Sequence, residues 1–155
     1  PDSPHMKSLW EAGVKSFKYH LKRSTGNALL TYEELNISII QIEVILNSRP
    51  LFILSNDPDD PSFLSPNNFL IGTTLTCLPV PNLPDLPSNR LSRWQRIQNI
   101  QQKVWQHWSK EYLHALQQRT KWHTVSPNLL PHTVVLLKED HLPPISWLLG
   151  IIQEV

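Results

Sequence analysis

The pattern of apolar and polar positions predicts two helices in the first third of the chain. The first spans about residues 7–23 and ends before Gly26-Asn27; its apolar stripe is Trp10, Val14, Phe17 and Leu21. The second spans about residues 31–48, starts with the capping pair Thr31 and Glu34, and has the apolar stripe Leu35, Ile39, Ile42 and Leu46. Because each stripe suits a core-facing helix, we expect the two helices to pack against each other.

The middle of the chain is rich in proline. Eight of the 14 prolines lie between Pro50 and Pro87. Proline lacks a backbone N–H and fixes φ, so this density excludes a long helix or a central strand. We therefore expect residues 51–88 to form an extended connector over a surface, anchored only at Phe69-Leu70-Ile71-Gly72.

The last part of the chain changes its hydrophobic period. A long helix is predicted from about residue 89 to residue 120, with a break near Ser109 left open; its apolar side carries Trp94, Ile97, Trp105, Trp108, Tyr112 and Leu116. Two strands follow at about residues 133–138 and 146–154. Two strands do not form a stable sheet alone, so the tail is expected to be part of a small β domain. The predicted fold class is mainly α with a small β tail.

Composition narrows the class of protein. Hydrophobic residues make up 40% of the 155 positions, which is enough for a core. No apolar run approaches the ~20 residues of a membrane span, and no signal peptide is visible. A single cysteine, Cys77, excludes an internal disulfide framework and a cysteine-rich zinc site. We expect an intracellular protein, in the nucleus or cytoplasm, without a membrane partner.

The net charge of +1 conceals a strong segmentation. Residues 1–27 carry five Lys or Arg and two acidic residues, residues 50–87 carry four Asp and no Lys or Arg, and residues 88–123 carry seven Lys or Arg and only Glu111. Two basic helical segments on either side of an acidic connector suggest a polyanion partner. The candidate phosphate contacts are Lys15, Lys18, Lys22, Arg93, Arg96, Lys103 and Lys110. The alternative for each row is a plain solvent-exposed face.

Glu11 is the candidate for metal chemistry. Lys15, Lys18 and Lys22 follow it at helical spacing, so a carboxylate would begin a row of lysines on one face. Two-metal phosphoryl chemistry needs several carboxylates, and only Asp2 precedes Glu11. The alternative is an ordinary ion pair between Glu11 and Lys15, which is worth about 0.2–0.5 kcal/mol. The tryptophans of the third helix are expected in the core and not as base-stacking platforms.

Several motifs occur in order along nearly the whole chain. They are Leu9-Trp10-Glu11-Ala12-Gly13-Val14-Lys15, Ile42-Glu43-Val44-Ile45-Leu46-Asn47-Ser48-Arg49-Pro50-Leu51, Leu64-Ser65-Pro66 with Phe69-Leu70-Ile71-Gly72, Arg93-Trp94, Trp108-Ser109-Lys110-Glu111-Tyr112-Leu113, Gln117-Gln118-Arg119-Thr120-Lys121-Trp122, Val135-Leu136-Leu137-Lys138-Glu139-Asp140 and Leu142-Pro143-Pro144. This combination resembles the integrase region of BEL/Pao-type retrotransposon polyproteins, which are similar to retroviral integrases.

The resemblance implies a fold and a site. Residues 1–50 would be the C-terminal helices of a truncated ribonuclease-H-like core, 51–88 a connector, 89–123 a long basic helical segment and 124–155 an incomplete SH3-like barrel. Glu11 would match the third carboxylate of an Asp, Asp, Glu triad that holds Mg²⁺ or Mn²⁺. Lys15 and Lys18 would match lysines that contact the donor DNA end. The two aspartates would lie upstream, so the isolated chain is expected to be inactive and to need no cofactor.

Five residues, at three places in the chain, depart from the family pattern. Lys7-Ser8 replaces a Gly-Gly pair before the Leu-Trp-Glu motif, and His132 replaces a turn glycine before the first barrel strand. Leu148 and Ile151 stand where the family has basic residues, which weakens a phosphate-facing surface. Three hypotheses therefore stay open. The chain is an integrase fragment that joins DNA ends only together with the N-terminal half of the enzyme, a non-enzymatic DNA-binding or interaction module, or a degenerate transposon relic. A homo-oligomer is compatible with each of them.

Overall fold

A computed structural model describes residues 4–55, 57, 62–75, 77, 81–84, 86–87, 90–117, 129–140 and 142–154, with side chains from Glu11 onward. Its helices are α1 (Pro4–Thr25), α2 (Tyr32–Asn47), α3 (Pro66–Ile71) and α4 (Arg93–Leu116). Its strands are β1 (Phe52–Ser55), β2 (Ser62–Leu64), β3 (Val134–Leu137) and β4 (Leu148–Ile151). The prediction of a mainly α chain with a small β part is confirmed, and residues 28–48 contain no strand.

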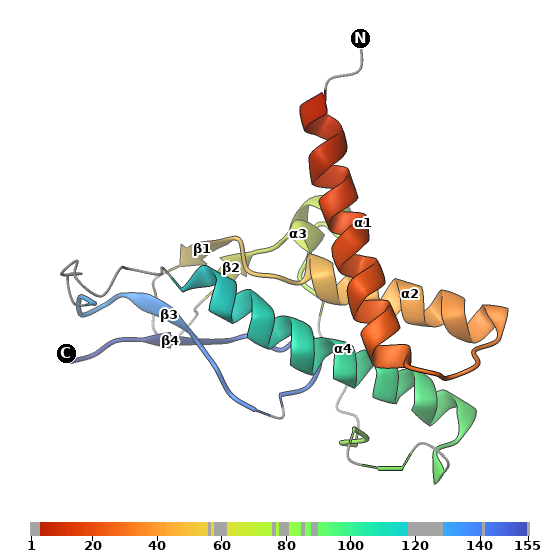
Figure 1. The fold of residues 1–155 in the computed structure, drawn as a ribbon. Helices are drawn as coiled ribbons and strands as arrows, with labels where there is room; N and C mark the ends of the chain where they lie inside the picture. Colours follow the sequence, from red (N-terminus) through yellow and green to blue (C-terminus); the bar gives the residue numbers. More distant parts are fainter. Residues whose placement is uncertain are drawn as a thin grey trace, which may run out of the picture.

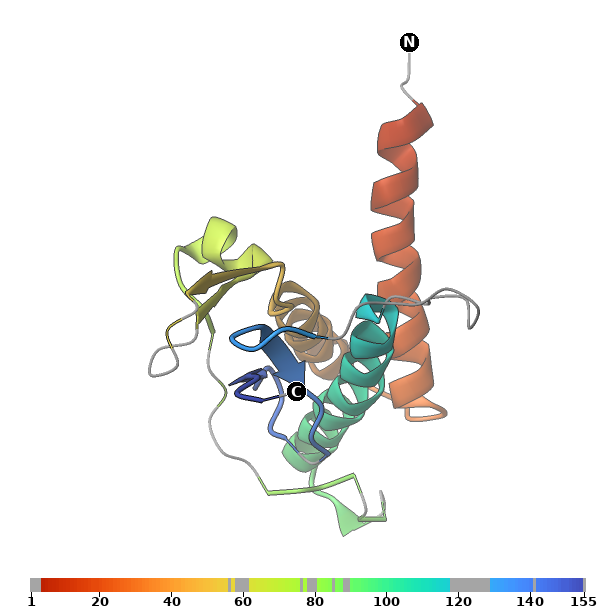
Figure 2. The same ribbon diagram turned by 90° about the vertical axis from the view of Figure 1, so that its left-hand side faces the viewer.

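Helices α1 and α2 both pack on α4, which is the central element of the described structure (Figures 1 and 2). The buried core joins Ile42 and Ile45 of α2 to Ile100 and Val104 of α4. Phe17 and Leu21 of α1 pack against this cluster, as does Leu46 of α2. The predicted stripes are therefore used mainly against α4, and Leu35 remains 37% exposed. The N-terminal half of α1 extends away from the other elements in both views.

Matching capping boxes start α2 and α4. The Thr31 hydroxyl accepts from the Glu34 N–H at 3.3 Å, and the Glu34 carboxylate accepts from the Thr31 N–H at 2.8 Å. Ser92 and Gln95 repeat this exchange at 3.3 and 2.9 Å. These bonds satisfy N–H groups that a helix leaves unpaired at its first turn.

Helices α2 and α4 run in the same direction. At their N-termini Arg93 Nε lies 3.2 Å from Glu34 Oε1, so the carboxylate that caps α2 also contacts α4. At their C-terminal ends the Tyr112 hydroxyl donates to the carbonyl oxygen of Pro50 at 2.6 Å. Contacts at both ends thus fix the register of one helix against the other.

The connector is more ordered than expected. Strands β1 and β2 form an antiparallel hairpin, and α3 follows directly. The predicted anchor is wrong: Phe69, Leu70 and Ile71 are 72%, 65% and 52% exposed, and the buried residues here are Ser65 and Asn67. The physical reason is that consecutive residues of a helix are rotated by about 100°, so Phe69, Leu70 and Ile71 of α3 cannot share one buried face.

A second attachment of the connector involves two buried amides on α4. The Asn99 side chain donates to the Leu83 carbonyl oxygen at 2.6 Å, and the Leu83 N–H donates to Gln102 Oε1 at 2.8 Å. Gln102 Nε2 donates to the Pro81 carbonyl oxygen at 2.8 Å. The two side chains therefore pair the connector backbone in the way that a neighbouring strand would.

The β tail docks on α4 through aromatic rings. Strands β3 and β4 are antiparallel, with Val134 opposite Ile151 and Leu137 opposite Leu148. Trp147, just before β4, meets Trp105 and Trp108 of α4 edge-to-face at centroid distances of 4.9 and 5.8 Å. Helix α4 is continuous from Arg93 to Leu116, so the break considered near Ser109 is absent. The helix ends at Leu116, with Gln117 already extended, so the predicted end at residue 120 was too late.

Candidate nucleic-acid interface

The face of α1 that carries Glu11 is open to solvent. Glu11, Lys15, Lys18 and Lys22 are all exposed, and the first three line one surface together with Val14. Glu11 lies in the N-terminal half of α1, which extends away from the other elements (Figure 1), and Lys22 lies in the last turn of the helix. The helix therefore brings one carboxylate and a row of ammonium groups together without covering them, which is the geometry that a phosphate backbone can reach.

Glu11 has no set of ligands around it in the described structure. Among the described residues there is no group of three or more His, Cys, Asp or Glu side chains that could hold a metal ion. Asp2, the only carboxylate before Glu11 in the sequence, lies outside the described residues. A divalent cation needs several oxygen ligands, so the residues described here do not form a metal site.

The C-terminal end of α1 is fixed to α4 by a polar cluster. Arg23 Nη1 lies 2.9 Å from Glu111 Oε1 and donates to the Tyr19 hydroxyl at 3.0 Å. His20 is only 3% exposed, with Nε2 3.7 Å from Glu111 and no hydrogen-bond partner on Nδ1. Burial lowers the pKa of His20, and Glu111 opposes this shift only in part. His20 is therefore neutral near pH 7, and the cluster sets the direction in which α1 leaves the core.

The predicted basic stripe of α4 does not form one open face. Arg93 is paired with Glu34 at 3.2 Å, and Lys110 Nζ is paired with Asp140 Oδ1 at 2.8 Å. Arg96 is exposed, but Lys103 is half-buried. The structure thus leaves the stripe partly neutralised and partly covered, because α4 is packed by α1, α2, the connector and the β tail.

The carboxylate that meets the basic stripe of α4 in the described structure comes from the β tail and not from the acidic connector. Asp57 is exposed, and Asp59, Asp60 and Asp85 lie outside the described residues. The carboxylate on Lys110 belongs to Asp140, in the segment between β3 and β4. Sequence reasoning missed Asp140 because nothing in the chain indicated that this segment folds back on α4.

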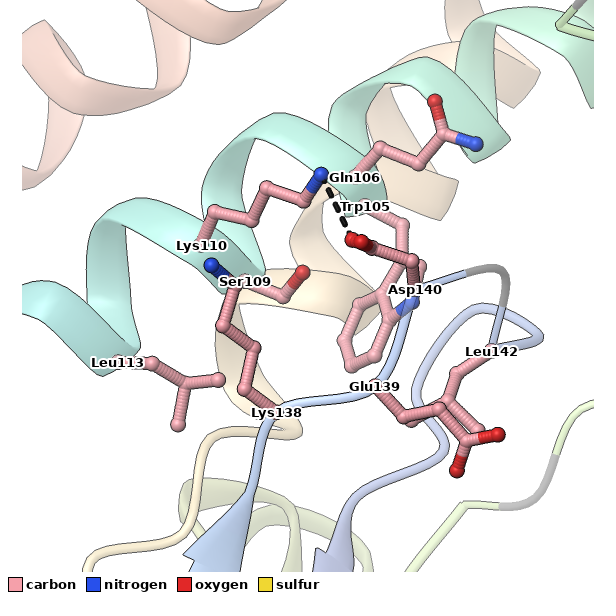
Figure 3. A pocket seen from close by; sticks show the side chains of 9 residues that line it. All are labelled: Trp105, Gln106, Ser109, Lys110, Leu113, Lys138, Glu139, Asp140 and Leu142. Carbon is pink, nitrogen blue, oxygen red and sulfur yellow. Dashed lines mark ion pairs between the residues drawn. The ribbon is translucent and has the colours of Figure 1, made fainter.

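Lys110 and Asp140 border a cavity of about 220 Å³ between α4 and the β3–β4 connection (Figure 3). Its apolar walls are Trp105, Leu113 and Leu142, and its polar walls include Gln106, Ser109, Lys138 and Glu139. Lys110, Leu113 and Lys138 also line a second, open groove that continues past His114 and Leu129. Lys138 was not among the predicted phosphate contacts; its place directly after an apolar strand run was the available signal.

Two of the three tryptophans considered for base stacking lie in the core, as the sequence predicted. Trp105 and Trp108 are 4% and 7% exposed. The prediction is wrong for Trp94, which is 54% exposed because it lies in the first turn of α4, before the buried residues that begin at Ile97. Trp108 stacks on Tyr112 at a centroid distance of 5.4 Å and an interplanar angle of 15°. These rings serve to hold the β tail on α4.

Comparison with known proteins places part of the chain in context. Residues 92–155 match the model of a family of unknown function (DUF5641). The matched segment begins at Ser92, the N-cap of α4, and contains α4, β3 and β4. No curated protein and no solved structure matches the chain. In the described part of the chain, no helix is long and apolar enough to cross a membrane.

Proposed function

We propose that this chain is the C-terminal part of a BEL/Pao-type retrotransposon integrase, and that it binds nucleic acid weakly and without sequence preference when isolated. The observation that carries the proposal is the exposed face of α1, where Glu11 precedes Lys15 and Lys18 on a helix that extends from the core. Phosphate attraction depends on the placement of cations and not on a bound metal, so this face can bind a backbone on its own.

In the proposal, α1 and α2 are the C-terminal helices of a ribonuclease-H-like core, and β3–β4 belongs to an SH3-like barrel. The exposed apolar residues of α2 support the first assignment: Leu35 and Ile40 are 37% and 51% exposed. A sheet of the missing half of the core would cover such residues. The division at residues 50, 88 and 123, and a nuclear or cytoplasmic location, belong to the same proposal.

Catalysis is proposed only for the full enzyme. There Glu11 would be one ligand of Mg²⁺ or Mn²⁺ in a site that two upstream aspartates complete. The described residues do not form that site, so no metal-dependent step is assigned to this chain alone. What α1 contributes by itself is the position of a DNA end, held by Lys15, Lys18 and Lys22 beside Glu11.

Two alternatives have specific observations in their favour. A non-enzymatic DNA-binding module agrees with an open lysine face on which Glu11 is the one carboxylate among the lining residues. A transposon relic agrees with the backbone at His132, which has a φ of 66° where the resembled family has glycine. Reading the source DNA upstream of Pro1 for in-frame aspartates separates the enzyme from the module.

The activity test is strand transfer of a labelled DNA end in the presence of Mg²⁺ or Mn²⁺. The isolated chain is expected to show no more product than its Glu11→Gln variant, and activity above that control would contradict the proposal. In parallel, duplex binding is expected in the non-specific range of about 10⁻⁴–10⁻⁶ M and should weaken steeply with salt. A chain that binds no DNA at low salt would leave the relic hypothesis standing.

A further inference from the structure

The cavity between α4 and the β3–β4 connection brings together groups that are far apart in the sequence. Lys110 comes from α4, and Lys138 and Asp140 come from the end of β3 and the segment after it. Figure 3 shows both lysine side chains at the same cavity, with Asp140 directed at Lys110 and Glu139 pointing away from it. Lys110 and Lys138 thus both border the cavity, and the carboxylate of Asp140 is in contact with Lys110.

We propose that this cavity is a binding site for a nucleic-acid phosphate, and that Asp140 occupies the place of the phosphate until nucleic acid displaces it. The inference rests on the proposed function, and it adds Lys138 to the contacts and a means of regulation to the site. The β3–β4 connection then acts as an internal competitor that lowers the affinity of the α4 surface.

A phosphate can displace Asp140 from Lys110 because the ion pair between these two side chains is exposed to solvent. The side chains of Lys110 and Asp140 are 54% and 60% exposed, and such pairs are weak because water and salt screen them. A phosphate can instead contact Lys110 and Lys138 together and accept a hydrogen bond from the Ser109 hydroxyl. A phosphate with two cationic partners and a hydrogen-bond donor therefore competes with the carboxylate of Asp140 in an ion pair that water and salt weaken.

The shape of the surface fits a polymer better than an isolated anion. Lys110, Leu113 and Lys138 line both the cavity and the open groove beyond it, which continues between the end of α4 and β3 to His114 and Leu129. A backbone phosphate in the cavity therefore leaves its neighbouring sugar and base a path along an apolar surface. The charge and the apolar floor together favour nucleic acid over a free inorganic anion.

The decisive variants are Asp140→Asn and its matched control Glu139→Gln, which remove the same charge from adjacent positions on one cavity. Each is titrated with a fluorescein-labelled DNA duplex at low salt and, separately, with inorganic pyrophosphate. Asp140→Asn is expected to tighten both affinities about two- to five-fold, the range that an exposed ion pair supplies. Glu139→Gln should give a clearly smaller gain in affinity, since it changes only the electrostatic potential around the cavity and breaks no ion pair with Lys110.

Repeating both substitutions in a chain that lacks Lys110 makes the test specific to the Lys110–Asp140 ion pair. In a Lys110→Gln chain, Asp140→Asn should give no more gain than Glu139→Gln, because its competitor role requires Lys110. Near-UV circular dichroism of the Trp105, Trp108 and Trp147 cluster checks that the β tail stays docked. A gain in affinity that appears only together with a loosened tail overturns the inference, because the cavity needs the tail docked on α4.

The two probes separate this inference from the proposed function. Equal gains from Asp140→Asn and Glu139→Gln, with DNA binding that still depends on Lys15, Lys18 and Lys22, overturn the inference and leave the function in place. The expected pattern with pyrophosphate but no DNA binding supports the anion site and overturns the proposed function. Absence of binding to either probe overturns both.

Discussion

The exposed face of α1 and the basic stripe of α4 carry similar side chains at similar spacing, yet their surroundings differ. On α1, Lys15, Lys18 and Lys22 are all exposed. On α4, Arg93 and Lys110 are in ion pairs and Lys103 is half-buried, because four other segments pack around this helix. Helical spacing indicates which charges share a face. It does not indicate whether that face meets water, which depends on contacts between distant segments.

The largest expected difference between the two helices concerns stability. Gln102→Ala in α4 should lower the free energy of unfolding by about 1–3 kcal/mol, because the Leu83 N–H and the Pro81 carbonyl lose their partners. Lys18→Ala on the exposed face of α1 should change it by less than about 0.5 kcal/mol. Urea denaturation followed by tryptophan fluorescence measures both. A small effect at Gln102 would mean that the connector attachment contributes little.

The next prediction concerns DNA. Replacing Lys15, Lys18 and Lys22 by Gln should weaken duplex binding about tenfold or more at low salt and reduce the slope of log affinity against log salt by about 2–3. The matched set Arg93, Arg96 and Lys103 to Gln should have a smaller effect, because Arg93 is paired and Lys103 is half-buried. Fluorescence anisotropy at several salt concentrations gives both quantities. Equal losses would show that the α4 stripe binds DNA despite its packing.

A third prediction uses the backbone of the β tail. His132 has a φ of 66°, a left-handed conformation that costs a residue with a side chain about 1 kcal/mol more than glycine. His132→Gly should therefore raise the free energy of unfolding by up to about 1 kcal/mol without affecting α1. Thr133, which follows it, is the control, since Thr133→Gly should destabilise the chain. A loss of stability in His132→Gly would show that the imidazole itself makes important contacts.

The smallest expected effect is a pH dependence at the α1–α4 junction. Burial lowers the pKa of His20 below its ordinary value of 6.5, so the unfolded chain takes up a proton first as the pH falls. The stability is then full above pH 6.5 and decreases below it, down to the folded pKa. Glu111 favours the charged form, whereas Arg23 and His107 oppose it, and the Tyr19 ring packs edge-on at 5.1 Å.

Thermal unfolding between neutral and mildly acidic pH checks this dependence. A His20→Gln chain should lose the part of the slope that His20 causes, and His114→Gln, at an exposed position, should keep it. An unchanged slope in His20→Gln would assign the pH dependence to other groups.

Local signals in the sequence predicted the helices well. The Thr31–Glu34 capping pair and the stop at Pro50 bound α2, and Gly26 takes the left-handed conformation, with a φ of 53°, at the end of α1. Each of these effects acts within a few residues, so it can be predicted from the local sequence. The two tail strands were placed for the same reason, by runs of apolar β-branched and Leu residues.

Features that depend on distant contacts could not be read in this way. Asn99 and Gln102 look like surface residues of a polar helix, yet they are buried against the connector. Phe69 to Ile71 look like an anchor, yet they are exposed. At the candidate site, the position of Lys15 and Lys18 on one face followed from the helix pattern. The Lys110–Asp140 pair did not, because it joins residues from two elements whose packing only the fold reveals.

Because α2 and α4 are parallel, the chain between them must run back from the C-terminal end of α2 to the N-terminal end of α4. Because the two helices start at the same end, the segment after α2 must travel back along a helix that, with 16 residues, is about 24 Å long. The cost of closing such a loop grows slowly, by about 0.6 kcal/mol for each doubling of its length. Insertions in the segment between α2 and α4 should therefore cost little stability, except next to Leu83, whose backbone is hydrogen-bonded to Asn99 and Gln102. That attachment point, and not the length of the path, fixes where the chain re-enters the core.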